Sequence, residues 1–147
     1  MKKLPDLIAA ARRVRLRARA AHSGFKVGAA LETREGKVFG GCNVENSTYG
    51  LTVCAERVAV WKALSEGEAA FRRIVIVADS EILTPPCGPC RQILWEYCGN
   101  IEVVLANLGG KIAKYRLNEL FPLPFDNRFL DKEGSRSKKQ TTRTPRH

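Results

Sequence analysis

The spacing of apolar residues predicts three main helices along the chain. Between residues 4 and 21, apolar side chains recur at steps of three and four, which is the pattern of an amphipathic helix that packs on a core. A helical pattern also covers 52–66, where Thr52 is the expected N-cap and Gly67 the C-terminal stop. A third helix is expected over 88–97, shortly after a break at two consecutive prolines.

Five further segments have the composition of strands. They are 25–33, 37–42, 74–77, 101–106 and 111–116. The first two flank the turn Glu35-Gly36 and therefore predict a hairpin. The continuous β-branched run at 74–77 is typical of a strand that is buried on both faces. The last segment is expected at an edge of the sheet, and a short helical turn is expected after it.

The predicted elements follow the order α, β, β, α, β, α, β, β. Helices interleaved with strands predict an α/β protein with three layers, α-β-α, around a mixed five-stranded sheet. A length of 147 residues with 44% hydrophobic residues suits one domain with one core, which we assign to residues 1–130. Residues 131–147 are rich in Ser, Thr, Lys and Arg, and we expect them to be a basic disordered tail.

The early apolar residues are interrupted by Pro5-Asp6 and run into five arginines, so they do not form the core of a signal peptide. No segment approaches the roughly 20 apolar residues that span a bilayer. These observations predict a cytoplasmic protein with no membrane partner.

The net charge of +10 is concentrated at the two ends of the sequence. Residues 1–19 carry seven bases and one acid, and residues 131–147 carry six bases and two acids. The segment 20–130 has twelve charges of each sign and is neutral. A basic protein suggests a nucleic-acid partner, but the neutral middle disfavours it. We therefore expect a solvated helix face and a solubilising tail, with phosphate binding by these ends as the alternative.

Two cysteine clusters carry the candidate chemistry. Cys54 and Glu56 lie at the start of one predicted helix, and Cys87 and Cys90 lie at the start of another. A helix N-terminus presents free N–H groups and a partial positive charge, which favour a thiolate. Three thiolates are good ligands for Zn²⁺. Thiol redox chemistry and a structural zinc site are the alternatives, but neither requires a carboxylate beside the third ligand.

The fourth position of such a zinc site has no obvious protein ligand. The sequence has two histidines, His22 and His147, and neither is near a cysteine motif. An open position that holds water is the mark of a catalytic zinc site.

Four sequence segments carry a resemblance to a known family. They are FKVGAA at 25–30, GCNVEN at 41–46, YGLTVCAER at 49–57 and PCGPCRQ at 86–92. In order and spacing they resemble the motifs of the small, homotetrameric, zinc-dependent cytidine deaminases that act on free nucleosides. The resemblance implies hydrolytic deamination of cytidine and 2′-deoxycytidine in pyrimidine salvage, giving the uridines and ammonia. It also implies one Zn²⁺ per chain, held by Cys54, Cys87 and Cys90.

The resemblance assigns a role to each remaining site residue. Glu56 would be the catalytic group that moves protons between water, ring N3 and the departing ammonia. Ribose would be bound by Asn43 and Glu45, the pyrimidine edge by the backbone of Ala55, and the base by Phe25 and Phe125, with Phe125 completing the site of a neighbouring subunit in a homotetramer. Arg57 and Arg91, beside the zinc ligands, would offset the negative charge of three thiolates.

Three other functions are alternatives to this one. The first is deamination of another aminopyrimidine nucleoside, such as a nucleoside antibiotic. The second is deamination of cytosine within a polynucleotide, which the basic ends suggest and the neutral middle disfavours. The third is a zinc-stabilised nucleic-acid-binding module, which has no use for Glu56.

Overall fold

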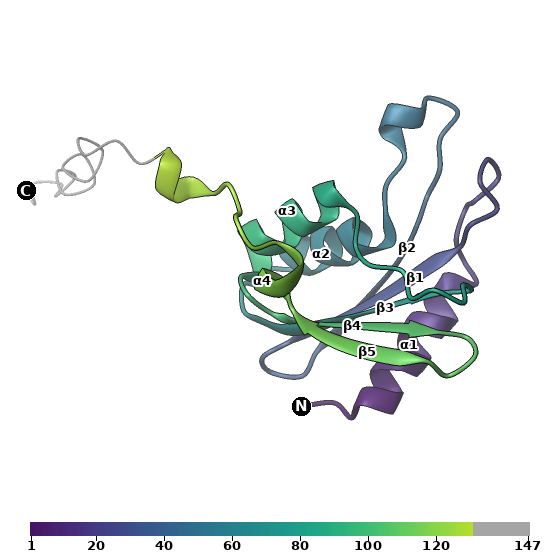
Figure 1. The fold of residues 1–147 in the computed structure, drawn as a ribbon, viewed down its shortest axis with the longest axis horizontal. Helices are drawn as coiled ribbons and strands as arrows, with labels where there is room; N and C mark the ends of the chain where they lie inside the picture. Colours follow the sequence, from purple (N-terminus) through teal and green to yellow (C-terminus); the bar gives the residue numbers. More distant parts are fainter. Residues whose placement is uncertain (131–147) are drawn as a thin grey trace, which may run out of the picture.

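The computed structural model describes residues 1–130 and shows one five-stranded sheet with helices on both faces (Figure 1). The main elements are α1 (Leu4–Arg15), β1 (Val27–Thr33), β2 (Val38–Cys42), α2 (Ala55–Ser65), β3 (Phe71–Ala78), α3 (Gly88–Cys98), β4 (Glu102–Asn107), β5 (Ile112–Arg116) and α4 (Leu117–Leu120). The predicted order of elements is confirmed. The tail that we expect at 131–147 lies outside the described residues.

The sheet is mixed, as the sequence predicts. Its strand order is β2-β1-β3-β4-β5. The central strands β3 and β4 are parallel, and every other neighbouring pair is antiparallel. The central strand β3 is buried from Arg73 to Ala78, whereas β5 at the edge alternates between exposed and half-buried positions.

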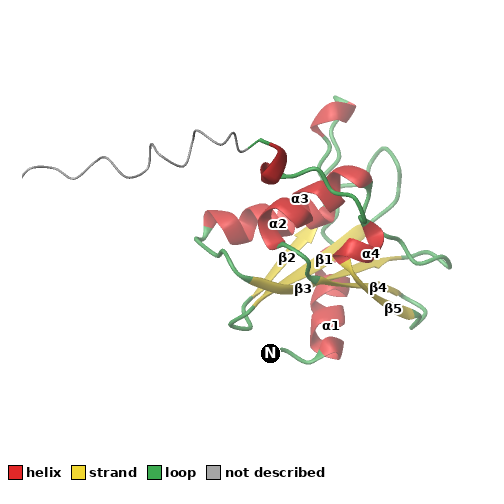
Figure 2. Cartoon of the chain, turned by 60° about the vertical axis from the view of Figure 1, so that its left-hand side comes forward, coloured by secondary structure: helices red, strands yellow, loops and turns green. Residues whose placement is uncertain are grey.

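Helices cover the two faces of the sheet unequally (Figure 2). One face is covered by α1, whose Leu7 and Ala11 pack against Val75 and Val104. The other face is covered by α2 and α3, which pack against the alternate side chains of the same strands, such as Ile76. Because successive side chains of a strand point to opposite faces, one run of apolar residues supplies both layers of core.

Two glycines let the helices approach the sheet closely. A Cβ atom at Gly28 would lie 2.0 Å from the carbonyl oxygen of Ala11 in α1. A Cβ atom at Gly41 would lie 2.3 Å from the carbonyl oxygen of Ala55 in α2. The first turn of α2 is therefore seated directly on β2.

A buried ion pair holds the segment before α1 against the sheet. Glu32 and Arg73 face each other across the β1–β3 ladder, and their Oε2 and Nε atoms are 2.7 Å apart. Glu32 also accepts a hydrogen bond from the backbone N–H of Lys2, and Arg73 donates one to the Lys2 carbonyl. A charged pair of this kind is tolerated inside the protein because its remaining hydrogen-bonding groups are satisfied.

The predicted helix at 4–21 is wrong at its C-terminal end, because α1 ends at Arg15. Beyond it the chain runs alongside the loop that follows β2. The N–H of Arg19 donates to the Asn43 carbonyl at 2.9 Å, and the Arg19 carbonyl accepts from the Glu45 N–H at 2.8 Å. Ala18 is still buried, as the apolar spacing predicts, although it is no longer helical.

The predicted start of the second helix is also wrong. Thr52 has an extended backbone with ψ 134°, and its hydroxyl accepts a hydrogen bond from the Asn46 N–H rather than capping a helix. The N-cap of α2 is Cys54. The strand predictions differ at their ends, most of all at β3, which extends beyond 74–77 in both directions. Within residues 1–130, the structure contains no helix both long and apolar enough to cross a bilayer.

Candidate active site

The two predicted cysteine clusters meet at the N-termini of α2 and α3. Cys54 is the N-cap of α2 and Cys87 is the N-cap of α3, both with extended backbone, and Cys90 lies buried in the first turn of α3. The Sγ atoms of Cys54 and Cys87 are 3.8 Å apart, and those of Cys87 and Cys90 are 3.3 Å apart. All three sulfur atoms lie within 4.8 Å of one another.

This sulfur geometry fits a tetrahedral zinc site. A Zn–S bond of about 2.3 Å in a tetrahedron places neighbouring sulfurs about 3.8 Å apart. In the described part of the chain, the cluster of candidate ligands at this position consists of the three cysteines alone. The donor set therefore suits a zinc ion with one position left for an exchangeable ligand, as in catalytic rather than structural sites.

Arg57 lies beside the sulfur cluster, as the sequence predicts. Its Nη2 donates to Cys54 Sγ at 3.5 Å and lies 3.4 Å from the Thr52 carbonyl. A hydrogen bond from the Cys90 thiol, together with the Arg57 guanidinium, lowers the pKa of Cys54 to about 5. The same thiol contact, together with burial, raises the pKa of Cys90. The site thus already stabilises negative charge on one sulfur.

Arg91 acts on the backbone near the ligands. Its Nε donates to the Pro86 carbonyl at 2.8 Å, and its Nη1 donates to the Leu120 carbonyl. The structure records no hydrogen bond from Arg91 to a sulfur within residues 1–130. Its contacts hold the segment that precedes Cys87 and tie α4 to the start of α3.

Glu56 is a buried carboxyl group next to the cysteines. It lies in the first turn of α2, is 5% exposed, and lines a cavity of about 230 Å³ together with Cys54 and Cys87. Burial raises the pKa of Glu56 to about 7, and the nearby Cys54 charge acts in the same direction. A carboxyl group with a pKa near neutrality can both accept and donate a proton.

The rest of the cavity comes from segments far apart in the sequence. Its other lining residues are Ser23, Phe25, Val27, Asn43, Thr52, Val53, Ala55, Thr84 and Pro85. Of the residues expected to bind the substrate, Phe25, Asn43 and Ala55 line this cavity, whereas Glu45 does not. Ser23, Thr84 and Pro85 were not predicted as site residues. The signal for the last two was their position directly before the Pro86-Cys87 motif.

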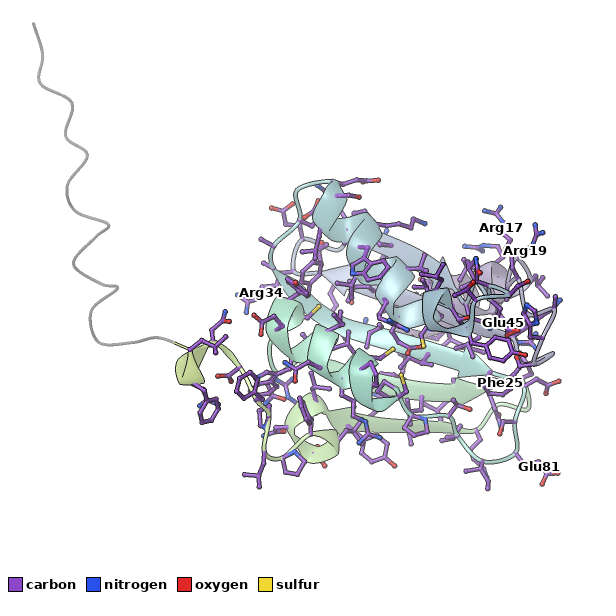
Figure 3. The ribbon with its side chains drawn as sticks, turned by 90° about the horizontal axis from the view of Figure 1, so that it is seen from above. Arg17, Arg19, Phe25, Arg34, Glu45 and Glu81 are labelled. Carbon is purple, nitrogen blue, oxygen red and sulfur yellow. The ribbon has the colours of Figure 1, made fainter. Side chains whose placement is uncertain are left out.

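Asn43 and Glu45 both hold the segment that leads into β1. The Asn43 Oδ1 accepts from the Val27 N–H, and its Nδ2 donates to the Phe25 carbonyl, each at 2.8 Å. The Glu45 carboxylate accepts three hydrogen bonds, from the backbone N–H groups of His22 and Ser23 and from the Ser23 hydroxyl. Its bonds to Ser23 lower the pKa of Glu45. Figure 3 shows Glu45 and Phe25 at the same end of the molecule.

Phe125 does not line the cavity of its own chain. Its ring is 57% exposed and stacks on Phe129 with centroids 5.5 Å apart. The segment is held on α3, because the Gln92 side chain donates to the Phe125 carbonyl and the Trp95 indole donates to Asp126. The structure therefore does not bring Phe125 together with the other expected site residues.

The three sulfur atoms form one cluster, and two of the cysteines line the same small cavity as the buried carboxyl group of Glu56. This arrangement matches that of zinc-dependent deaminases. The sequence model described as "Cytidine and deoxycytidylate deaminase zinc-binding region" matches residues 1–106. The chain belongs to this family.

Individual relatives agree with the family assignment. The chain is 43% identical over 125 residues to a cytidine deaminase of Sporosarcina psychrophila, which covers 84% of this chain and 92% of the relative. The crystal structure of a cytidine deaminase from Burkholderia pseudomallei matches with a TM-score of 0.82 and 44% identity, covering 84% of this chain and all of that one. A blasticidin-S deaminase of Bacillus cereus is 35% identical over 107 residues, covering 67% of this chain and 76% of that protein.

Proposed function

We propose that the protein hydrolyses cytidine and 2′-deoxycytidine to uridine and 2′-deoxyuridine with release of ammonia. The observation that carries this proposal is the placement of Glu56 in the same cavity as Cys54 and Cys87. A metal site with only a structural or a redox role would not need a buried carboxyl group at that place. The related cytidine deaminases support the choice of substrate.

Each side chain around the cavity has a chemical task in this reaction. Cys54, Cys87 and Cys90 would hold one Zn²⁺, which when bound supplies Lewis-acid chemistry that makes water nucleophilic at neutral pH. Glu56 takes a proton from the attacking water and delivers it to ring N3. It then takes the proton of the new hydroxyl group at C4 and gives it to the amino group, so that the C4–N bond breaks, the C4 carbonyl forms and ammonia leaves. Arg57 holds negative charge on the sulfur of Cys54.

The nucleoside would be oriented by the walls of the cavity. Phe25 offers an apolar surface for the base, and the backbone of Ala55 lies at the start of α2, where N–H groups have no partner within the helix. Asn43 has one further N–H on Nδ2 for a ribose hydroxyl, because the other N–H binds the Phe25 carbonyl. The Glu45 carboxylate would accept a hydrogen bond from a hydroxyl group of the same ribose.

The active form would be a homotetramer in which Phe125 enters the cavity of a neighbouring subunit. The exposure of Phe125, Leu123, Phe129 and Leu130 supports this proposal, because adjacent exposed apolar side chains are typical of interfaces. A cytoplasmic enzyme of pyrimidine salvage is the cellular role that fits this substrate.

A second candidate function is deamination of a nucleoside antibiotic. The resemblance to the blasticidin-S deaminase of Bacillus cereus favours it, although that protein is less similar than the cytidine deaminases reported above. Both candidates use the same metal site and the same carboxyl group, so they differ only in the ligand that the cavity accepts.

An ultraviolet assay separates these functions. Purified protein would be mixed with cytidine, deoxycytidine, CMP, single-stranded DNA and blasticidin S in parallel, with Glu56→Gln protein as the matched control. We expect rapid turnover of the two free nucleosides by the wild type alone. Turnover of blasticidin S without turnover of cytidine would establish the second candidate instead, and equal rates for wild type and variant would refute both.

A further inference from the structure

All of the excess positive charge of the described chain lies in α1 and in the segments directly before and after it. Residues 1–26 contain eight bases and one acid, Asp6, whereas residues 27–130 contain eleven bases and twelve acids. The eight bases are Lys2, Lys3, Arg12, Arg13, Arg15, Arg17, Arg19 and Lys26. Helix α1 lies alone on its side of the sheet, opposite α2 and α3 (Figure 2), and its last turn contains Arg12, Arg13 and Arg15.

These bases are not neutralised within the described chain. The ion pairs recorded for residues 1–130 join Lys37 to Glu68, Arg73 to Glu32, and Arg128 to Asp126, and none involves this group. The C-terminus of a helix attracts cations, but its dipole is equivalent to only about half a negative charge. The last turn of α1 contains three arginines. The helix dipole therefore accounts for only a small part of the charge.

The surface beside α1 is hollowed on both flanks, and bases line both hollows. One hollow, of about 490 Å³, is lined by Lys2, Arg13 and Arg17, by Lys62 from α2, and by Asp6 as its one acid. The other, of about 620 Å³, is lined by Arg12, Arg13 and Arg15 together with apolar side chains. The basic side chains of α1 thus lie between two hollows in the surface.

The basic surface continues toward the end of the molecule that holds the cavity. Figure 3 shows Arg17 and Arg19 at the same end as Glu45 and Phe25. The backbone of Arg19 is paired directly with the loop that carries Asn43 and Glu45. An extended anion that lay along α1 would therefore reach the neighbourhood of the catalytic cavity.

We propose that the α1 face binds a nucleic-acid strand through its phosphate backbone, without reading its sequence. A row of bases that make no ion pair within residues 1–130, with a single acid among them, complements a regular polyanion. Contacts of this kind supply most of non-specific nucleic-acid binding. The sequence alone left a solvated helix face and phosphate binding as alternatives. Phosphate binding is favoured because bases line both of the hollows beside α1. The proposal does not depend on the deaminase activity.

The test measures how strongly the full-length protein binds a fluorescent single-stranded RNA at several salt concentrations. The variant Arg12→Gln/Arg13→Gln/Arg17→Gln removes three bases whose side chains form no ion pair with another residue of the described chain, 1–130, and glutamine keeps a similar helix propensity. The matched control is Arg34→Gln/Arg72→Gln/Arg116→Gln. It removes the same charge from residues that line a hollow elsewhere, with Arg34 at the opposite end of the view in Figure 3.

We expect the wild type to bind with a steep salt dependence. Each phosphate contact to a single strand contributes about 0.7 to the slope of log K against log salt, so the α1 variant should reduce that slope by about 2. The control should reduce it far less, and both variants should keep wild-type turnover of free cytidine. The proposal is overturned by absence of salt-dependent binding in the wild type, or by equal losses in the two variants. Binding to vesicles of anionic lipid without binding to RNA would overturn it as well.

Discussion

Asn43 joins two segments that form one wall of the cavity, so its replacement by alanine tests how that wall is held. The side chain is 9% exposed and makes hydrogen bonds of 2.8 Å to the Val27 N–H and the Phe25 carbonyl. Removing it leaves the buried Val27 N–H without that partner, which costs about 1–3 kcal/mol. The Phe25 carbonyl lies nearer the surface and can bind water instead. Losing the hydrogen bond from Asn43 to this carbonyl therefore adds about 0.5–1.5 kcal/mol to the destabilisation.

The free energy of unfolding should therefore fall by about 1.5–4.5 kcal/mol in total, measured by urea denaturation at one fixed protein concentration. The KM for cytidine should rise as well, because Phe25 loses its support. The control is Asn46→Ala, which removes an exposed side chain whose one hydrogen bond within the described residues is accepted from the Thr48 N–H. It should change stability by less than about 1 kcal/mol. If both variants were equally stable, Asn43 would not be the anchor of this wall.

Three further changes test the metal, the proton carrier and the shared site. Elemental analysis should find one zinc per chain, and exhaustive removal of zinc should abolish turnover; iron at the site, or activity without metal, would contradict the assignment. Glu56→Gln should keep zinc and fold but lose at least about 10²-fold in turnover, and retention of a tenth of wild-type activity would rule out its role. Phe125→Ala should raise KM for cytidine more than it lowers thermal stability. An active monomer in sedimentation, or an unchanged KM, would refute a shared site.

Most of the fold could be predicted from local patterns, and the errors occur where distant segments decide the structure. The β-branched run at 74–77 identified the central strand because burial on both faces requires such a run. The end of α1 could not be predicted in the same way, since apolar spacing continues to residue 21. What ends the helix is pairing of Arg19 with residues 43–45, more than twenty positions away.

The candidate site was predictable where the chemistry depends on residue type and spacing. Cys54, Cys87 and Cys90 were identified because thiols at two helix N-termini suit a metal, and the structure brings them together. The N-cap of α2 was misplaced because Thr52 has the right side chain for a cap, but its hydroxyl binds the Asn46 N–H. The contacts of Asn43 within the chain were not foreseen either, because they depend on the fold.

The positions of the cysteines also affect how the protein folds. Cys54 and Cys87 are separated by 33 positions, and the whole of β3 lies between them. A metal held by both closes this stretch into a loop, as a cross-link would. By the relation used for disulfides, such a closure reduces the entropy of the unfolded chain by an amount worth about 3–4 kcal/mol at room temperature. Hydrogen exchange in α3 should therefore accelerate first when the metal is removed, because α3 is the helix that the closure holds against α2.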